Sequence, residues 1–239
     1  LLMSKLTVII PAFNESKTIL NILQRVLDVD LADNIQKEIV IVDDFSTDAT
    51  QQVVQQFIDA NPNQEFQYFK MDKNRGKGAA IHKGIDLASG DYVIVQDADL
   101  EYDPDEYNIL LKPILNGSSD VVYGSRFIGG KPHRVMFFGH TLGNKFLTLL
   151  SNIFTNLNLT DMETCYKLFK RDVIKNLDLK EQRFGFEPEV TAKIAKIKGL
   201  KIMEVGISYY GRTYQEGKKI GWKDAFRAIY CIIKYNLFK

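Results

Sequence analysis

Short apolar runs alternate with segments of helical periodicity along the first part of the chain, and this alternation strongly constrains the fold. Each run is rich in β-branched or aromatic residues and has the length of a buried strand, whereas the segments between the runs repeat apolar residues at helical spacing. The predicted strands cover residues 6–10, 39–42, 66–69 and 92–95, and Pro11 is expected to stop the first of them. Strands that alternate with helices predict an α/β fold with a mostly parallel central sheet and helices on both faces.

The loop after the fourth predicted strand is acidic, because Asp97, Asp99 and Glu101 follow the apolar run within six residues. Carboxylates gathered at the end of a buried strand repel one another and call for a compensating cation. Oxygen ligands suit Mg²⁺ or Mn²⁺ rather than zinc, and such ions complete their shells with water and substrate phosphates. The loop therefore predicts a metal site that holds a diphosphate, and the alternative is a strand followed by a solvated turn.

Other polar loops are expected to meet the acidic one, because ligands of parallel sheets bind beyond the carboxyl ends of the strands. The loops after the first, second and fourth strands carry Glu15, Asp43, Asp44, Asp97 and Asp99. The glycine-rich segment of residues 74–78 follows the third strand, either as a phosphate cradle or as a turn whose glycines supply positive φ. A Gly-x-Gly-x-x-Gly segment after the first strand and a P-loop are both absent, which argues against an ordinary dinucleotide-binding fold.

Composition bounds the class of protein. The net charge of +1 on 239 residues does not indicate binding to nucleic acid or another bulk polyanion. Cys165 and Cys231 lie far apart without metal-ligand spacing, which favours a reduced, cytosolic setting. No run approaches the roughly 18 apolar residues of a membrane span, so any membrane contact is expected to be peripheral.

Four ordered motifs resemble the inverting family-2 glycosyltransferases, which have the GT-A fold. They are Pro11-Ala-Phe-Asn-Glu15, Val42-Asp-Asp-Phe-Ser-Thr-Asp48, Asn74-Arg-Gly-Lys-Gly78 and Asp97-Ala98-Asp99. Three later motifs resemble the polyprenyl-phosphate glycosyltransferases, which include dolichyl-phosphate mannose and glucose synthases and undecaprenyl-phosphate relatives. These are Val122-Tyr-Gly-Ser-Arg-Phe127, Asp161-Met-Glu-Thr-Cys-Tyr-Lys-Leu-Phe169 and Arg212-Thr-Tyr-Gln-Glu-Gly-Lys218. The likeness covers nearly the whole chain.

The resemblance implies roles for particular residues. The expected ligand-binding residues are Pro11, Phe13, Glu15, Asp43, Asp44, Lys77, Ala98, Arg126, Arg212 and Lys218, and the expected metal ligands are Asp97, Asp99 and Glu101. Arg126, Arg212 and Lys218 are expected to meet a phosphate, either of the donor or of the acceptor. Glu101 stands where many relatives have Gln, and Phe13 replaces a usual Tyr. Phe45 stands where Gly is common, so the tip of its loop is expected to differ in shape.

The acceptor decides whether a general base is needed. In the reaction that the resemblance implies, Asp97, Asp99, Arg126 and Glu187 are the expected catalytic residues. A polyprenyl phosphate is already anionic and needs no base, whereas an alcohol acceptor, as in the extension of a cell-surface glycan, requires one. Glu187 and Glu189 are the candidates for that base, or else carboxylates that favour a helix start through the helix dipole. A nucleotide-binding module without catalysis is a third possibility, which the intact acidic motif opposes.

Two segments combine basic and apolar residues. Residues 131–160 contain no Asp or Glu, and residues 201–239 contain eight Lys or Arg against three Asp or Glu. Residues 131–160 and the end of the chain, residues 218–239, are each expected to lie at a membrane interface or to pack on the domain as an ordinary helix. We therefore expect a GT-A catalytic domain over residues 1–211 and a basic amphipathic segment over residues 212–239. The expected location is the cytoplasmic face of a membrane or the cytoplasm, and homo-oligomers are possible.

Overall fold

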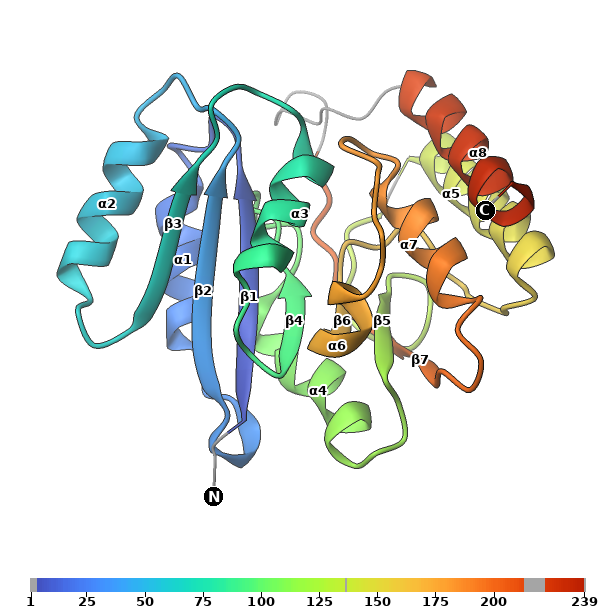
Figure 1. Ribbon diagram of the computed structural model, residues 1–239, viewed down its shortest axis with the longest axis horizontal. Coiled ribbons are helices and arrows are strands. Elements are labelled where there is room, and N and C mark those ends of the chain that lie inside the picture. The colour runs from blue at the N-terminus through green and yellow to red at the C-terminus, as the bar shows by residue number, and fades with distance from the viewer. Residues whose placement is uncertain (1–3, 136, 213–221, 239) are drawn as a thin grey trace.

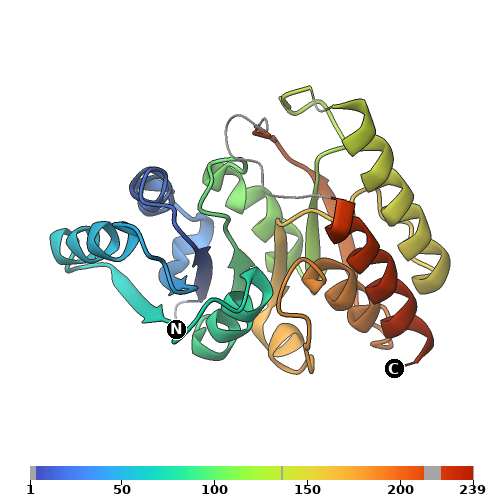
Figure 2. The same ribbon diagram turned by 90° about the horizontal axis from the view of Figure 1, so that it is seen from above.

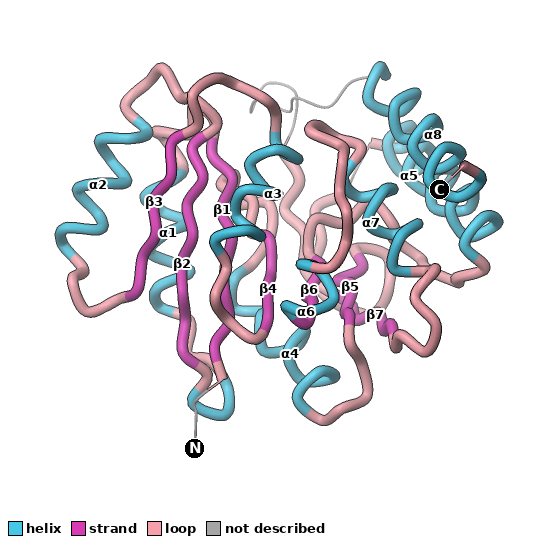
Figure 3. The backbone as a smooth tube through the Cα atoms, in the orientation of Figure 1, coloured by secondary structure: helices cyan, strands magenta, loops and turns pink. Residues whose placement is uncertain are grey.

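The computed structural model describes residues 4–135, 137–212 and 222–238. Within these ranges seven strands form one sheet in the order β3-β2-β1-β4-β6-β5-β7 (Figures 1 and 3). The strands are β1 (Lys5–Ala12), β2 (Gln36–Asp43), β3 (Glu65–Lys70), β4 (Tyr92–Val95), β5 (Val121–Ser125), β6 (Lys167–Lys170) and β7 (Ile202–Gly206).

The sheet is mostly parallel, as predicted. β1 pairs in parallel with β2 and β4, β2 pairs in parallel with β3, and β5 pairs in parallel with β7. Only β6 departs from this direction, because it runs antiparallel to its neighbours β4 and β5. The first half of the chain thus forms the parallel part, and β6 joins it to β5 and β7.

Helices cover both faces of the sheet (Figure 2), which also confirms the prediction. The helices are α1 (Ile19–Asp28), α2 (Thr50–Ala60), α3 (Lys77–Leu87), α4 (Tyr107–Leu115), α5 (Phe138–Thr155), α6 (Arg171–Lys175), α7 (Phe186–Ile194) and α8 (Trp222–Leu237), with short 3₁₀ turns at Ala32–Asn34 and Pro104–Glu106. α1 illustrates why they form, because Ile19, Ile22, Leu23 and Val26 recur at helical spacing and are all buried.

The expectation that Pro11 stops the first strand is wrong. β1 continues through Pro11 to Ala12, and Pro11 lies opposite Val42 of β2. The register of β1 with β4 ends at Ile9 and Val95, so β1 has only β2 as a neighbour beyond that point. A residue without an N–H group is tolerated there, because a strand that is an edge on one side can lack a donor on that side.

One hydrophobic core runs from the parallel strands to the C-terminal helix. Val8, Ile9 and Ile10 of β1 are fully buried, and each such side chain contributes about 1.5–3 kcal/mol to folding. Ile232 of α8 belongs to the same core, and α8 packs against α5 and α7. The predicted division of the chain at residue 212 remains a prediction.

Candidate functional site

The loops after β1 and β2 are joined by hydrogen bonds at the carboxyl edge of the sheet. The backbone N–H of Asn14 donates to Ser46 Oγ at 2.9 Å, and the N–H of Thr47 donates to Asn14 Oδ1 at 2.9 Å. A third bond of 2.9 Å runs from the N–H of Glu15 to Thr50 Oγ1. The two loops therefore form one unit, as expected for segments that bind the same ligand.

Aromatic side chains stand at the tips of both loops. Phe13 and Phe45 are 37% and 43% exposed. Phe45 has φ of +67°, in the left-handed region that a glycine occupies without strain. The loop thus takes a glycine-type backbone conformation although its residue is Phe, and it presents an exposed aromatic ring at its tip.

Asp43 and Asp44 are buried and organise the loops around them. Asp43 accepts hydrogen bonds from the N–H of Ser46 at 2.7 Å and from the hydroxyl of Tyr68 at 2.8 Å. Asp44 accepts from the backbone N–H groups of Arg75 and Gly76, at 2.8 and 2.7 Å. These bonds fasten the glycine-rich loop to the loop after β2, and the predicted contact of both carboxylates with a ribose or base stays a prediction.

Two basic side chains offset the negative charge of the aspartates in the acidic loop after β4. Asp97 forms an ion pair of 2.7 Å with the ammonium group of Lys77, which lies at the start of α3. Asp99 forms an ion pair of 2.5 Å with the guanidinium group of Arg212, which follows β7. Residues from three distant parts of the chain thus meet at the carboxyl edge of the sheet.

Glu101 takes a different position from the two aspartates. It accepts hydrogen bonds from the hydroxyl of Tyr209 at 2.8 Å and from the backbone N–H of Arg212 at 2.7 Å. Both carboxylate oxygens therefore hold the segment after β7. In the described part of the chain no group of three or more His, Cys, Asp or Glu is close enough to hold a metal ion, so the expected three-carboxylate set is not assembled.

The electrostatics of the acidic loop fit a divalent cation held by two carboxylates. Burial, with repulsion from Asp97 and Glu101, raises the pKa of Asp99 to about 7. A cation would relieve that repulsion, and Mg²⁺ commonly takes one or two protein carboxylates and completes its shell with water and phosphate oxygens. Asp97 and Asp99 therefore fit a site that is completed by the substrate. Glu15 is also near, because its charge helps to raise the pKa of Arg212 against the effect of burial.

Lys77 is held as a cation by its surroundings. Burial by itself lowers the pKa of Lys77. The charges of Asp97 and Glu187 oppose this effect and raise that pKa well above its ordinary value. A permanently charged ammonium group beside Asp97 is suited to a diphosphate, because it would offset charge that develops on a leaving group.

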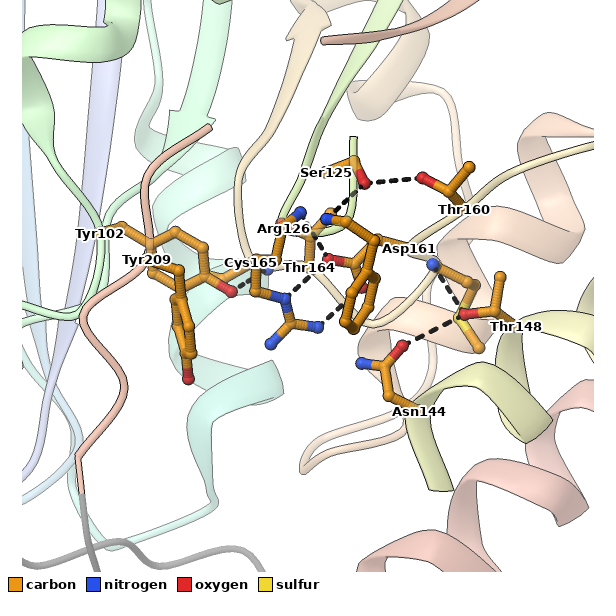
Figure 4. Close-up of polar contacts among 12 residues, drawn as sticks. Tyr102, Ser125, Arg126, Asn144, Thr148, Thr160, Asp161, Thr164, Cys165 and Tyr209 are labelled. Carbon is orange, nitrogen blue, oxygen red and sulfur yellow. Dashed lines mark hydrogen bonds and ion pairs between the residues drawn. The ribbon is translucent and has the colours of Figure 1, made fainter. Parts of the chain in front are cut away.

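Arg126 follows β5 and is bound by a buried carboxylate (Figure 4). Its Nε and Nη2 atoms donate to Asp161 at 2.6 and 2.7 Å, and its backbone N–H donates to the same side chain at 3.0 Å. Asp161 is fully buried. The fork of Arg126 is therefore fixed in one orientation by Asp161, a role that the sequence motif alone did not reveal.

Tyr209 connects Arg126 to the acidic loop. The guanidinium carbon of Arg126 lies 5.1 Å from the centre of the Tyr209 ring, and the Tyr209 hydroxyl bonds to Glu101. Tyr102 packs against Tyr209 (Figure 4), and their ring centres lie 5.2 Å apart. Sequence reasoning missed both tyrosines. Both lie near predicted site residues in the sequence, because Tyr102 follows Glu101 directly and Tyr209 lies three residues before Arg212.

The two glutamates at the start of α7 differ in their contacts. Glu189 accepts hydrogen bonds from the backbone N–H groups of Lys180 and Glu181, at 2.8 and 2.7 Å, and from the ammonium group of Lys193 at 2.6 Å. These contacts favour a structural role for Glu189. Glu187 is buried, and its charge acts with burial to raise the pKa of Glu163 to about 8.

An exposed apolar surface lies on α5 and α8, which pack side by side (Figures 1 and 2). We call it the α5–α8 surface. It consists of Phe138, Leu142, Phe146, Leu149 and Ile153 on α5 and Phe226, Tyr230, Ile233 and Leu237 on α8, which are 37% to 82% exposed. On each helix these residues recur every three or four positions, so each helix shows an apolar stripe to the outside. Among the described residues, no helix is long and apolar enough to cross a membrane.

Lys218, which was predicted to bind phosphate, lies outside the described residues.

A mostly parallel sheet with carboxylates and basic side chains at its carboxyl edge is the arrangement of a GT-A glycosyltransferase. The sequence model of glycosyl transferase family 2 matches residues 7–178, and the chain therefore belongs to that family. The fold and the enzyme class expected from the motifs are thus confirmed.

Two relatives carry names that concern lipid-linked sugars. The chain is 28% identical to a dolichol-phosphate mannosyltransferase of Pyrococcus furiosus over 97% of its own length, and it spans 64% of that relative. It is 24% identical to a dodecaprenyl-phosphate galacturonate synthase of Rhizobium johnstonii, over 98% of the chain and 67% of the relative.

Among solved structures, the fold is similar to that of glucosyl-3-phosphoglycerate synthase from Mycobacterium tuberculosis in complex with Mn²⁺, UDP and glucosyl-3-phosphoglycerate. The TM-score is 0.73 at 19% identity, over 98% of this chain and 80% of the other. At this identity the comparison establishes the shared fold.

Proposed function

We propose that the protein transfers one sugar, with inversion, from a UDP- or GDP-sugar to a polyprenyl phosphate, and that it requires Mg²⁺ or Mn²⁺. The observation that carries the proposal is the meeting of Asp97 and Asp99 with Lys77 and Arg212 at the carboxyl edge of the sheet. Such a mixed set matches a metal-bound diphosphate, which carries negative charge next to a cation. The names of the two lipid-phosphate transferases agree with this acceptor.

The chain's own residues would position the donor. Phe13 and Phe45 offer exposed rings beside the buried pair Asp43 and Asp44, where a base and ribose would lie. A bound divalent ion would offset the charge that grows on the leaving diphosphate. Lys77 adds a point charge to the same region.

A phosphate acceptor makes a general base unnecessary. An anionic oxygen can attack the anomeric carbon directly, provided that cations overcome its repulsion from the donor. Arg126 and Arg212 are the candidates among the described residues, with Tyr209 between Arg126 and the acidic loop. Asp161 takes Nε–H and one N–H of Nη2, so Nη1 and the second hydrogen of Nη2 are the donors that Arg126 would offer to a phosphate.

The α5–α8 surface supports a lipid acceptor. An apolar area of this kind on a monomer marks contact with a partner or a membrane. Lys145 on α5 is exposed next to Phe146, and residues 131–160 contain no carboxylate that would repel anionic lipid. We therefore assign the surface to a lipid bilayer at its cytoplasmic face. Binding to vesicles of phosphatidylcholine and phosphatidylglycerol is the expected result, and dimers without vesicle binding would assign it to a second copy of the chain.

A second candidate function is the extension of a glycan, with Glu187 as general base. The buried position of Glu187 beside Lys77 favours it, since the charge of Glu187 contributes to the raised pKa of Lys77. An alcohol acceptor would need such a base, whereas a phosphate would not.

One experiment separates the candidates. The protein is incubated with Mn²⁺, radiolabelled nucleotide sugars and a short polyprenyl phosphate, and the label is followed into the organic phase. We expect transfer to the lipid by the wild-type protein and by Glu187→Gln. Turnover that occurs only with a sugar acceptor, and that Glu187→Gln abolishes, would establish the second function instead.

A further inference from the structure

The loop of residues 180–185, between α6 and α7, is fixed to the C-terminal helix. The side chain of Glu181 is buried, and its Oε2 atom accepts hydrogen bonds from Nε and Nη2 of Arg227, at 3.0 and 2.6 Å. Its Oε1 atom accepts from the hydroxyl of Tyr235 at 2.8 Å. Arg227 and Tyr235 both belong to α8, so a single buried carboxylate holds this helix to the loop.

The loop of residues 180–185 also contacts the glycine-rich segment of residues 74–78. The backbone N–H of Ala79 donates to the carbonyl oxygen of Gln182 at 3.0 Å. A Cβ atom on Gly76 would lie 2.7 Å from the same oxygen, and one on Gly78 would lie 2.4 Å from the carbonyl oxygen of Glu181. Real Cβ atoms do not approach backbone oxygens this closely, so the contact requires glycine at both positions.

Lys77 stands between these two glycines and reaches the acidic loop. Its ammonium group is 2.7 Å from Asp97. The backbone N–H of Gly76 donates to Asp44 at 2.7 Å. The backbone that carries Lys77 is therefore clamped between the loop after β2 and the loop of residues 180–185.

We propose that Glu181 is a positioning residue through which α8 holds Lys77 at Asp97. The ammonium group sits at the end of a flexible chain, so its place depends on the backbone at the start of α3. A misplacement of about 1 Å can cost about 100-fold in rate. The inference deepens the proposed function and rests on it, because α8 also carries part of the α5–α8 surface, and contact of α8 with lipid would then bear on the donor site.

The first test measures nucleotide affinity by calorimetry with MnCl₂ and either UDP or GDP. Arg227→Ala removes two of the three hydrogen bonds that α8 donates to Glu181 and leaves the bond from Tyr235. We expect nucleotide binding to weaken by about tenfold. Arg227→Lys keeps a cation opposite Glu181 and should restore part of the loss. The matched control is Lys170→Ala, which removes a half-exposed ion pair of 2.7 Å with Asp120 and should leave nucleotide binding unchanged.

The second test asks whether Arg227 acts through Lys77. The binding free-energy changes of two substitutions do not add when one residue acts through the other. Arg227→Ala should therefore have no further effect on nucleotide affinity when Lys77 is already Ala. A purely structural role of Arg227 would weaken binding by the same factor in both backgrounds. Equal factors, or unchanged affinity in Arg227→Ala, would overturn the inference.

A ligand-free readout keeps the inference separate from the proposed function. Amide hydrogen exchange in peptides that cover residues 74–80 reports directly on the clamped backbone. We expect faster exchange there in Arg227→Ala and in Gly78→Ala. The control Gly143→Ala places a methyl group where nothing lies within 4 Å and should leave this exchange unchanged. If the wild-type protein binds neither nucleotide but the exchange responds, the coupling stands and the proposed function fails. If nucleotide binds but the exchange does not respond, the coupling fails.

Discussion

Substitutions at the buried ion pair of Arg126 and Asp161 can show its contribution to stability separately from its contribution to turnover. Asp161 is fully buried and accepts three hydrogen bonds from Arg126. Asp161→Ala would leave a buried guanidinium group without its counter-charge, which costs about 3–5 kcal/mol. That is a large part of the roughly 5–15 kcal/mol that keeps a domain folded. We expect urea unfolding with linear extrapolation to show this loss.

Two comparison variants make the test decisive. Glu65→Ala removes a 2.7 Å ion pair with Lys5 in which Glu65 is half exposed, and it should cost no more than about 1 kcal/mol. The double variant Arg126→Met/Asp161→Leu replaces the pair by apolar groups and should recover most of the stability without recovering turnover. If Asp161→Ala costs no more than Glu65→Ala, or if the double variant is as unstable as Asp161→Ala, the reasoning is refuted.

Two further predictions concern individual residues. Phe45→Gly should raise the free energy of unfolding by about 0.5–1 kcal/mol. The left-handed backbone costs Phe about 1–2 kcal/mol, and glycine removes this strain but loses more backbone entropy on folding, which offsets part of the gain. A urea midpoint that does not rise would show that packing of the ring outweighs the strain. Burial and Glu187 raise the pKa of Glu163 from 4.5 to about 8, so the folded state binds a proton more tightly than the unfolded state. Stability should therefore fall as pH rises from about 4.5 to about 8, and Glu163→Gln should flatten that fall; an unaltered slope would contradict the assignment.

The parallel half of the fold could be predicted because its signal is local. β1, β2 and β4 contain short apolar runs, and burial on both faces makes such runs continuous rather than alternating. β3 is a partly exposed edge strand, which its aromatic residues indicated. The place of β6 could not be predicted in this way. Its residues Lys167–Lys170 include two lysines, and its antiparallel pairing joins strands that are distant in the sequence.

The residues of the candidate site could be predicted from the sequence, but the hydrogen-bond partners of those residues could not. The sequence placed Asp97, Asp99 and Lys77 in loops that follow strands, and the sheet edge brings them together. It could not show that Glu101 turns to Tyr209 or that Asp44 binds backbone N–H groups of the glycine-rich loop. Hydrogen bonds of this kind depend on the distance between loops, which no residue spacing encodes.

The amphipathic character of the segment after Lys131 could be predicted from the sequence, but which of its apolar residues are buried could not. An apolar stripe at helical spacing can face either the core or the outside. On α5 the residues Leu147 and Thr148 face inward, while Phe146 and Leu149 remain exposed. The packing of α5 against α7 and α8 decides which face of α5 is covered.

The most direct measurement of the central claim is the position of manganese in crystals grown with MnCl₂ and UDP or GDP. We expect an anomalous difference peak between the carboxylates of Asp97 and Asp99, bridged to the diphosphate, and no such peak in Asp99→Ala. A manganese peak elsewhere on the chain, or nucleotide bound at this edge of the sheet with no metal beside it, would contradict the account.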